Sequence, residues 1–144
     1  MPFCLGALMS GFKPLKGKSA PQITQKAGHS FASKLEAAVF ELLWLRERAG
    51  EIRNLKCQVY VYLSNARIAC IPDFQFEYVA SGEVAYAEAK GFETDIWRLK
   101  KRLWKAYGPG PLEIWKGSHR KPKLIETVYP VAEQQLKLGS GHEV

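Results

Sequence analysis

The first clear hydrophobic pattern in the chain is helical and predicts an α-helix over residues 31–48. Leu35, Val39, Leu42 and Leu43 recur at three- and four-residue spacing, which places them on one face of a helix. Gly50 follows as a stop signal. We expect the apolar face of this helix to be buried.

A second helical pattern covers residues 95–107, with Thr94 or Asp95 in the N-cap position and a Gly-Pro pair after its end. One side of this helix is basic. The positions expected to face inward are Ile96, Leu99 and Leu103.

Three alternating runs between these helices predict strands, over residues 57–63, 68–79 and 84–90. Ser81-Gly82 supplies a turn, so the second and third runs form a hairpin. In the third run, alanines at alternate positions share one face of the strand. Their side chains are small enough for a helix to pack closely against that face. Residues 111–115 predict one more short strand. The order helix, three strands, helix, strand predicts an α/β (α+β) fold with a mixed central sheet flanked by helices.

Both ends of the chain differ from this patterned middle. We expect a basic N-terminal arm over residues 1–30, one folded domain over 31–117 and a basic C-terminal extension over 118–144. Three cysteines without a CxxC pair favour a reducing, cytoplasmic setting over a disulfide scaffold or a zinc ribbon. Neither a signal peptide nor an apolar run long enough to cross a membrane is expected.

Charge adds the first indication of a partner. The formal net charge is +7, and clusters of lysine and arginine without any acid occupy residues 1–30, 98–105 and 116–123. A single cluster is explained as well by solvated surface, but three together favour nucleic acid.

Candidate chemistry lies on the predicted hairpin. Alternation puts Glu88 and Lys90 on one face of their strand, and the hairpin can bring Asp73 beside Glu88. Two carboxylates, with the backbone carbonyl of Ala89 between them, are the oxygen ligands that Mg²⁺ prefers. A cation held there would assist phosphodiester hydrolysis, with Lys90 next to the attacking water. Taken singly, Asp73 is explained as a solvated strand residue, and Glu88 with Lys90 as a surface ion pair.

Glu36 lies at the edge of the buried face of the first helix and could reach the same place as an additional ligand. The alternative is that Ser33-Lys34-Leu35-Glu36 is a capping box, in which Glu36 only satisfies the start of the helix.

These residues resemble the motif of the PD-(D/E)xK nuclease superfamily, which shares a restriction-endonuclease-like core. The motif stands here as Pro72-Asp73 followed by Glu88-Ala89-Lys90, with Glu36 in the position of the preceding helix. Within the superfamily the chain is similar to small phage and prophage nucleases, including Holliday junction resolvases. That similarity covers residues 31–116 and rests further on Gln58, Thr94 and the basic second helix. Glu88 stands where these relatives often have Asp, and Val59 where they often have Pro.

The resemblance implies a Mg²⁺-dependent DNA endonuclease, with Mn²⁺ as a substitute, in which Asp73, Glu88, Ala89 and Glu36 bind the metal. Glu36, Asp73, Glu88 and Lys90 would be the catalytic residues. The residues expected to contact DNA are Lys13, Lys16, Lys18, Lys34, Gln58, Arg98, Lys100, Lys101, Lys105, Arg120 and Lys121.

Small size and distributed positive charge favour branched DNA or a four-way junction as the substrate. A homodimer is then expected, because both strands of a symmetric junction must be cut. As a phage enzyme of DNA recombination, the protein would act in the bacterial host cytoplasm. Two alternatives remain open: a nicking or sequence-directed phage endonuclease with the same site, and a nucleic-acid-binding protein that does not cut.

Two groups of aromatic residues also have two interpretations. Trp97 and Trp104 pack in the core or at an interface, which we favour, or stack on bases. Tyr60 and Tyr62, on one strand face with Gln58, either line a DNA groove or pack beneath it.

Overall fold

The computed structural model describes residues 24–26 and 28–131. Along the chain its elements are β1 (Thr24–Lys26), β2 (His29–Phe31), α1 (Lys34–Arg48), β3 (Ile52–Cys57), β4 (Val61–Tyr62), β5 (Ala69–Cys70), β6 (Phe74–Tyr78), β7 (Val84–Ala89), α2 (Asp95–Tyr107), β8 (Leu112–Ser118) and β9 (Lys121–Val128).

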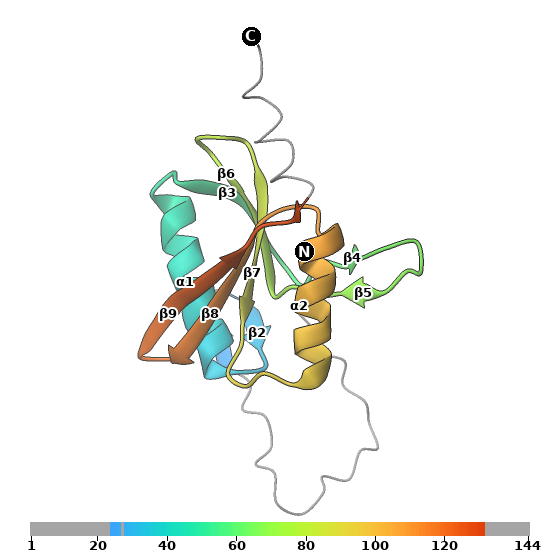
Figure 1. The fold of residues 1–144 in the computed structure, drawn as a ribbon. Coiled ribbons are helices and arrows are strands. Elements are labelled where there is room, and N and C mark those ends of the chain that lie inside the picture. Colours follow the sequence, from blue (N-terminus) through green and yellow to red (C-terminus); the bar gives the residue numbers. More distant parts are fainter. Residues whose placement is uncertain (1–23, 27, 132–144) are drawn as a thin grey trace, which may run out of the picture.

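A mixed five-stranded sheet forms the centre of the molecule, in the order β3-β6-β7-β8-β9. β7 and β8 are parallel and are connected through α2, whereas the other neighbouring strands are antiparallel. The pairs β1–β2 and β4–β5 form two further small sheets. The helices α1 and α2 flank the central sheet (Figure 1). The α+β fold with a mixed sheet is thus confirmed, and it is consistent with a restriction-endonuclease-like core.

The first part of the core lies between α1 and one face of the sheet. Val39 and Leu43 of α1 are fully buried there, in one cluster with Phe74 and Phe76 of β6. Ala87 of β7 belongs to the same cluster and is also fully buried. Helix α1 therefore packs against the alanine side chains of β7, as the sequence predicts.

The second part of the core lies under α2, on the other face of the sheet. Trp97 and Trp104 are buried, and the Trp104 ring lies edge-on against Tyr86 of β7. The indole Nε1 of Trp104 donates a hydrogen bond of 2.8 Å to the carbonyl oxygen of Gly110. Core packing of these tryptophans is therefore confirmed. The expected inward orientation of Ile96 and Leu99 was wrong, because their exposed fractions are 69% and 49%.

Helix α2 begins where the sequence predicts. The Thr94 hydroxyl accepts a hydrogen bond from the backbone N–H of Trp97 at 3.1 Å, so Thr94 is the N-cap. Gly108 is the C-cap.

Two strand predictions were wrong in their boundaries. The first sheet strand is Ile52–Cys57, not residues 57–63, because Gln58 has a φ of 50° and leaves the extended conformation. The predicted strand over 68–79 is divided into β5 and β6. Buried Pro72 lies between them, and proline lacks the N–H that a sheet ladder needs.

The segment after residue 118 forms β9, an edge strand antiparallel to β8. Gly117, before the turn, has a φ of 104°, and a Cβ there would lie 2.6 Å from the backbone oxygen of Lys121. The sheet therefore continues past residue 117, the predicted end of the folded domain.

At the other end, β1 and β2 form an antiparallel pair in part of the predicted N-terminal arm. Residues 1–23 and 27 of that arm, and residues 132–144 of the predicted extension, lie outside the described residues. No helix within residues 24–26 and 28–131 is long and apolar enough to span a membrane.

Candidate active site

The β6–β7 hairpin brings Asp73 and Glu88 together. Phe74, the first residue of β6, pairs with Ala87. Asp73, the residue before β6 begins, therefore stands opposite Glu88. The backbone N–H of Asp73 donates to Glu88 Oε2 at 3.2 Å, and the N–H of Ala89 donates to Asp73 Oδ2 at 2.8 Å. Each carboxylate is therefore held by a backbone donor on or next to the other residue. One oxygen of each, Asp73 Oδ1 and Glu88 Oε1, takes no part in these two bonds.

Lys90 lies beside this pair. Its Nζ is 3.8 Å from Glu88 Oε1 and 5.0 Å from the centroid of the Trp97 ring. The backbone N–H of Lys90 donates to the carbonyl oxygen of Trp115 at 2.8 Å, which fixes the chain against β8. An aromatic face and a carboxylate thus hold the ammonium from two directions.

Glu36 comes from the first turn of α1 and is only 6% exposed. Its backbone N–H donates to the Ser33 hydroxyl at 3.0 Å, which caps the helix. Burial, and next the negative charge of Asp73, raise the pKa of Glu36 from an ordinary 4.5 to about 7, while a hydrogen bond from the Ala32 backbone opposes this. The Ser33 hydroxyl thus supplies its half of the predicted capping box, whereas the Glu36 carboxylate accepts from Ala32 and lies within electrostatic range of Asp73.

Burial is the main reason that the pKa values of Asp73 and Glu88 are both raised. The Glu88 carboxylate adds to the rise in the pKa of Asp73, and that of Glu36 adds to the rise in the pKa of Glu88. Lys90 opposes both shifts but does not cancel them. Three carboxylates, one buried and two half-buried, with too little positive charge nearby favour the binding of a cation.

A cavity of about 160 Å³ opens at Glu88 and Lys90. Its other lining residues are Cys70, Ile71, Thr94, Ile96, Trp97 and Lys100. The indole Nε1 of Trp97 is buried without a hydrogen-bond partner among the described residues. A buried donor of this kind normally binds a water or a ligand.

Cys70 is a poor candidate for a nucleophile. Burial, and next the charge of Glu88, raise the pKa of its thiol from 9.0 to about 11, so the thiol stays protonated at neutral pH. The chemistry of the cavity therefore rests on the Glu88 carboxylate and on the amines of Lys90 and Lys100.

The donor set fits a hard divalent cation held by two carboxylates. No group of three or more His, Cys, Asp or Glu side chains within residues 24–26 and 28–131 has an arrangement that could hold a metal ion. Mg²⁺, however, is typically bound by one or two carboxylates and completes its shell with waters and substrate phosphates. Asp73 and Glu88 provide such a pair, with Glu36 behind them.

Three of the residues expected to contact DNA lie at one end of the sheet. The β8–β9 turn, with exposed Arg120 and Lys121, projects beyond the end of β7 that carries Glu88, because Trp115 of β8 pairs with Ala89. Lys34 is exposed at the start of α1. The beginnings of both helices lie at this end (Figure 1).

Other predicted contacts have different surroundings. The N–H of Gln58 donates to the carbonyl oxygen of Asp73 at 2.8 Å, so Gln58 supports the site through its backbone. Lys100 lines the site cavity, whereas Arg98, Lys101 and Lys105 line a separate cavity. Lys13, Lys16 and Lys18 lie outside the described residues.

Sequence reasoning missed two features of the site. Trp97 was predicted only to pack or to stack on bases, yet its ring also contacts the Lys90 ammonium and lines the site cavity. The signal in the sequence was that Trp97 stands three residues before Lys100, a predicted DNA contact that lines the same cavity. Cys70 and Ile71 of the cavity had no signal in the sequence pattern. Comparisons with family models, with characterised proteins and with solved structures find no match to this chain.

Proposed function

We propose that the protein is a metal-dependent endonuclease that hydrolyses phosphodiester bonds in DNA. The observation that supports this most strongly is the reciprocal bonding of Asp73 and Glu88 beside Lys90, because Glu88 and Lys90 also line a cavity. The resemblance of these residues to the PD-(D/E)xK motif also supports it. Basic side chains at the same end of the sheet suit the phosphate backbone.

In this proposal Asp73 and Glu88 hold Mg²⁺ or Mn²⁺. A bound ion of this kind polarises a phosphate and lowers the pKa of a bound water. The Lys90 ammonium, fixed between Glu88 and the Trp97 ring, orients the attacking water and offsets negative charge on the phosphate. Glu36 adds negative charge behind the pair, which strengthens cation binding.

Branched DNA, in particular a four-way junction, is the proposed substrate. The folded part is small, and its basic residues lie on α2 and on several other elements. This distribution suits contacts to phosphates and not to base edges. We infer a homodimer, since a symmetric junction needs two cuts. The free thiol of buried Cys70 suits the reducing cytoplasm of a bacterial host.

A panel of end-labelled DNA substrates tests this proposal. The panel contains a four-way junction, a flap, a nicked duplex, a linear duplex and a single strand, each incubated with Mg²⁺ and with EDTA. We expect paired cuts in the junction with Mg²⁺ only. Cutting without structural preference would indicate a nicking or sequence-directed endonuclease. Binding of DNA without cutting in any substrate would overturn the enzyme proposal in favour of a binding protein.

Site variants belong in the same panel. Asp73→Asn and Lys90→Met should abolish cutting but leave DNA binding and the fold intact. Lys56→Gln, which removes an exposed charge on β3, is the matched control and should cut like the wild type. Cutting by purified Asp73→Asn at the wild-type rate would refute the site assignment.

A further inference from the structure

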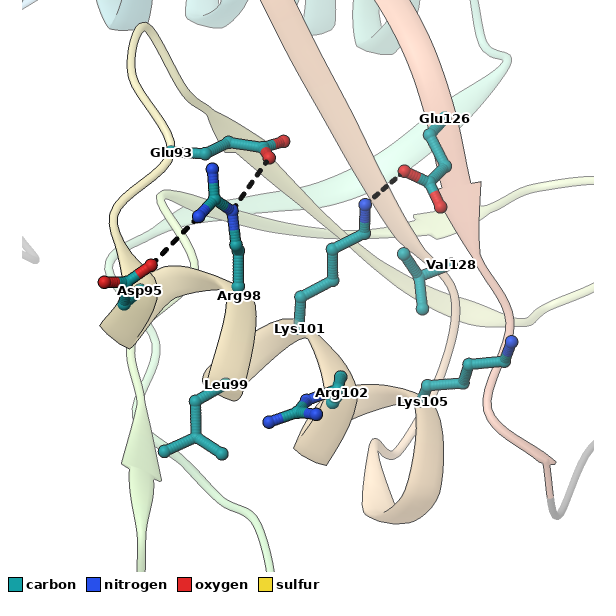
Figure 2. Close-up of a pocket in the computed structure, with 9 residues that line it drawn as sticks. All are labelled: Glu93, Asp95, Arg98, Leu99, Lys101, Arg102, Lys105, Glu126 and Val128. Atoms are coloured by element: carbon teal, nitrogen blue, oxygen red, sulfur yellow. Dashed lines mark hydrogen bonds and ion pairs between the residues drawn. The ribbon is translucent and has the colours of Figure 1, made fainter.

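A second and larger cavity, of about 550 Å³, lies between α2 and β9 (Figure 2). We call it the α2–β9 groove; its lining residues are Glu93, Asp95, Arg98, Leu99, Lys101, Arg102, Lys105, Glu126 and Val128. The volume falls within the ~300–1,000 Å³ that is typical of ligand clefts.

The groove is distinct from the site cavity, although α2 contributes to both. Arg98, Lys101, Arg102 and Lys105 follow one another at i, i+3, i+4 and i+7, so they share one face of the helix. Ile96, Trp97 and Lys100 of α2, together with its N-cap Thr94, line the site cavity instead. No residue lines both cavities. The helix therefore presents two separate surfaces.

Part of the positive charge in the groove is paired with acids. Arg98 Nη1 lies 2.9 Å from Asp95 Oδ1, its Nε lies 3.9 Å from Glu93 Oε2, and Lys101 bonds to Glu126. Figure 2 shows Arg98 between its two acids and Lys101 extended toward β9. Exposed pairs of this kind contribute little to stability. An incoming anion can therefore displace them.

Arg102 and Lys105 differ from these two cations. Both are exposed, and neither forms an ion pair with any residue in the described part of the chain. Leu99 and Val128 add apolar surface to the same lining. Unpaired cations on a helix face beside apolar surface match a phosphodiester backbone, which presents phosphates and sugars together.

We propose that the α2–β9 groove is a second phosphate-backbone site, which holds a strand of the DNA other than the strand being cut. The inference rests on the proposed function only for the identity of the polyanion. Two separate surfaces on one helix let the protein contact two arms of a branched substrate at once. Affinity for the junction then depends on Arg102 and Lys105, and the chemical step does not.

The salt dependence of DNA binding tests this inference. Fluorescence anisotropy with a labelled four-way junction, in EDTA, gives the binding constant K of the full chain at several salt concentrations. The test variant is Arg102→Gln with Lys105→Gln, because glutamine suits exposed helix positions. The matched control is Arg48→Gln with Arg53→Gln, which removes the same charge from the end of α1 and from β3, at the opposite edge of the sheet from β9.

Loss of two phosphate contacts reduces the slope of log K against log salt concentration by about 2. Between 50 and 200 mM salt, the wild-type affinity should then fall about tenfold further than that of the test variant. The control should keep the wild-type slope. An unchanged slope in the test variant, or an equal change in the control, would overturn the inference.

Cleavage kinetics separate this inference from the proposed function. In Mg²⁺ the test variant should show a raised KM for the junction with an unchanged kcat. If the wild type binds the junction with a steeper salt dependence than the test variant but never cuts, the proposed function fails and the second site stands. If the wild type cuts and the test variant shows neither a changed slope nor a raised KM, the second site fails alone. A lower kcat in the test variant would also contradict the inference, because the groove would then act on the chemical step.

Discussion

Replacing Glu36 by Gln should make the metal-free protein more stable at pH 8 and change its stability much less at pH 5. Glu36 is buried and its pKa in the folded protein is about 7, against 4.5 for an ordinary glutamate. Between these pH values the unfolded chain has lost the proton that the folded protein keeps. Folding stability therefore decreases as the pH rises from about 4.5 to about 7.

The size of the effect follows from the difference between the two pKa values. One pKa unit corresponds to about 1.4 kcal/mol, so a raised pKa of this size costs the folded state about 3 kcal/mol above pH 7. Gln carries no charge at either pH, and its amide oxygen can still accept the hydrogen bond from the Ala32 backbone. Rearrangement of the site around the Glu36 charge in the wild type reduces the gain in the free energy of unfolding. We therefore expect Glu36→Gln to be more stable than the wild type by about 1–3 kcal/mol at pH 8.

Urea unfolding in EDTA, followed by tryptophan fluorescence at pH 5 and pH 8, measures this difference. The quantity to compare is the free energy of unfolding of the variant minus that of the wild type at each pH. Glu83→Gln, on the turn between β6 and β7, is the charge control against which the pH dependence of Glu36→Gln is compared. A difference for Glu36→Gln that is the same at both pH values would refute the reasoning.

Three further predictions concern stability. Saturating Mg²⁺, at about 100 times its Kd, should raise the free energy of unfolding of the wild type by about 2.7 kcal/mol and leave Asp73→Asn unchanged in the same urea assay. Tyr78→Phe should cost about 1–3 kcal/mol in urea unfolding, because the Tyr78 hydroxyl donates at 2.7 Å to Glu113, which is buried and would lose a partner; an unchanged midpoint would show that the bond contributes nothing. Gly110→Ala should cost about 2 kcal/mol or more and lower the Tm measured by circular dichroism, because its Cβ would lie 2.3 Å from the backbone oxygen of Val84; an unchanged Tm would mean that the chain adjusts freely there.

Elements with a strong local signal were predictable from the sequence. The cap at Thr94 and the glycine after α2 define its ends through local hydrogen bonds. The position of Asp73 opposite Glu88 follows from the hairpin, because an antiparallel register is fixed by the turn. These features depend on neighbouring residues and need no knowledge of the rest of the fold.

Features that depend on distant contacts were not predictable. Ile96 and Leu99 fit the helical period as well as Trp97 and Trp104 do, and only the space beneath α2 selects the tryptophans. The left-handed backbone of Gln58 ends β3 although its neighbours alternate like a strand. The edge strand β9 buries little of its surface and so lacks the alternation of a half-buried strand. Lys100 belongs to the same basic run as Lys101, but its direction from the helix places it at the site cavity.

The rate of strand cutting as a function of Mg²⁺ concentration tests the central claim most directly. A labelled four-way junction would be incubated with the wild type, with Asp73→Asn and with the control Lys56→Gln. We predict a rate that rises with Mg²⁺ to saturation in the wild type and in the control, and that stays at the background level in Asp73→Asn. Cutting in EDTA, or equal rates for the wild type and Asp73→Asn at every Mg²⁺ concentration, would contradict the claim that Asp73 and Glu88 form a metal-dependent active site.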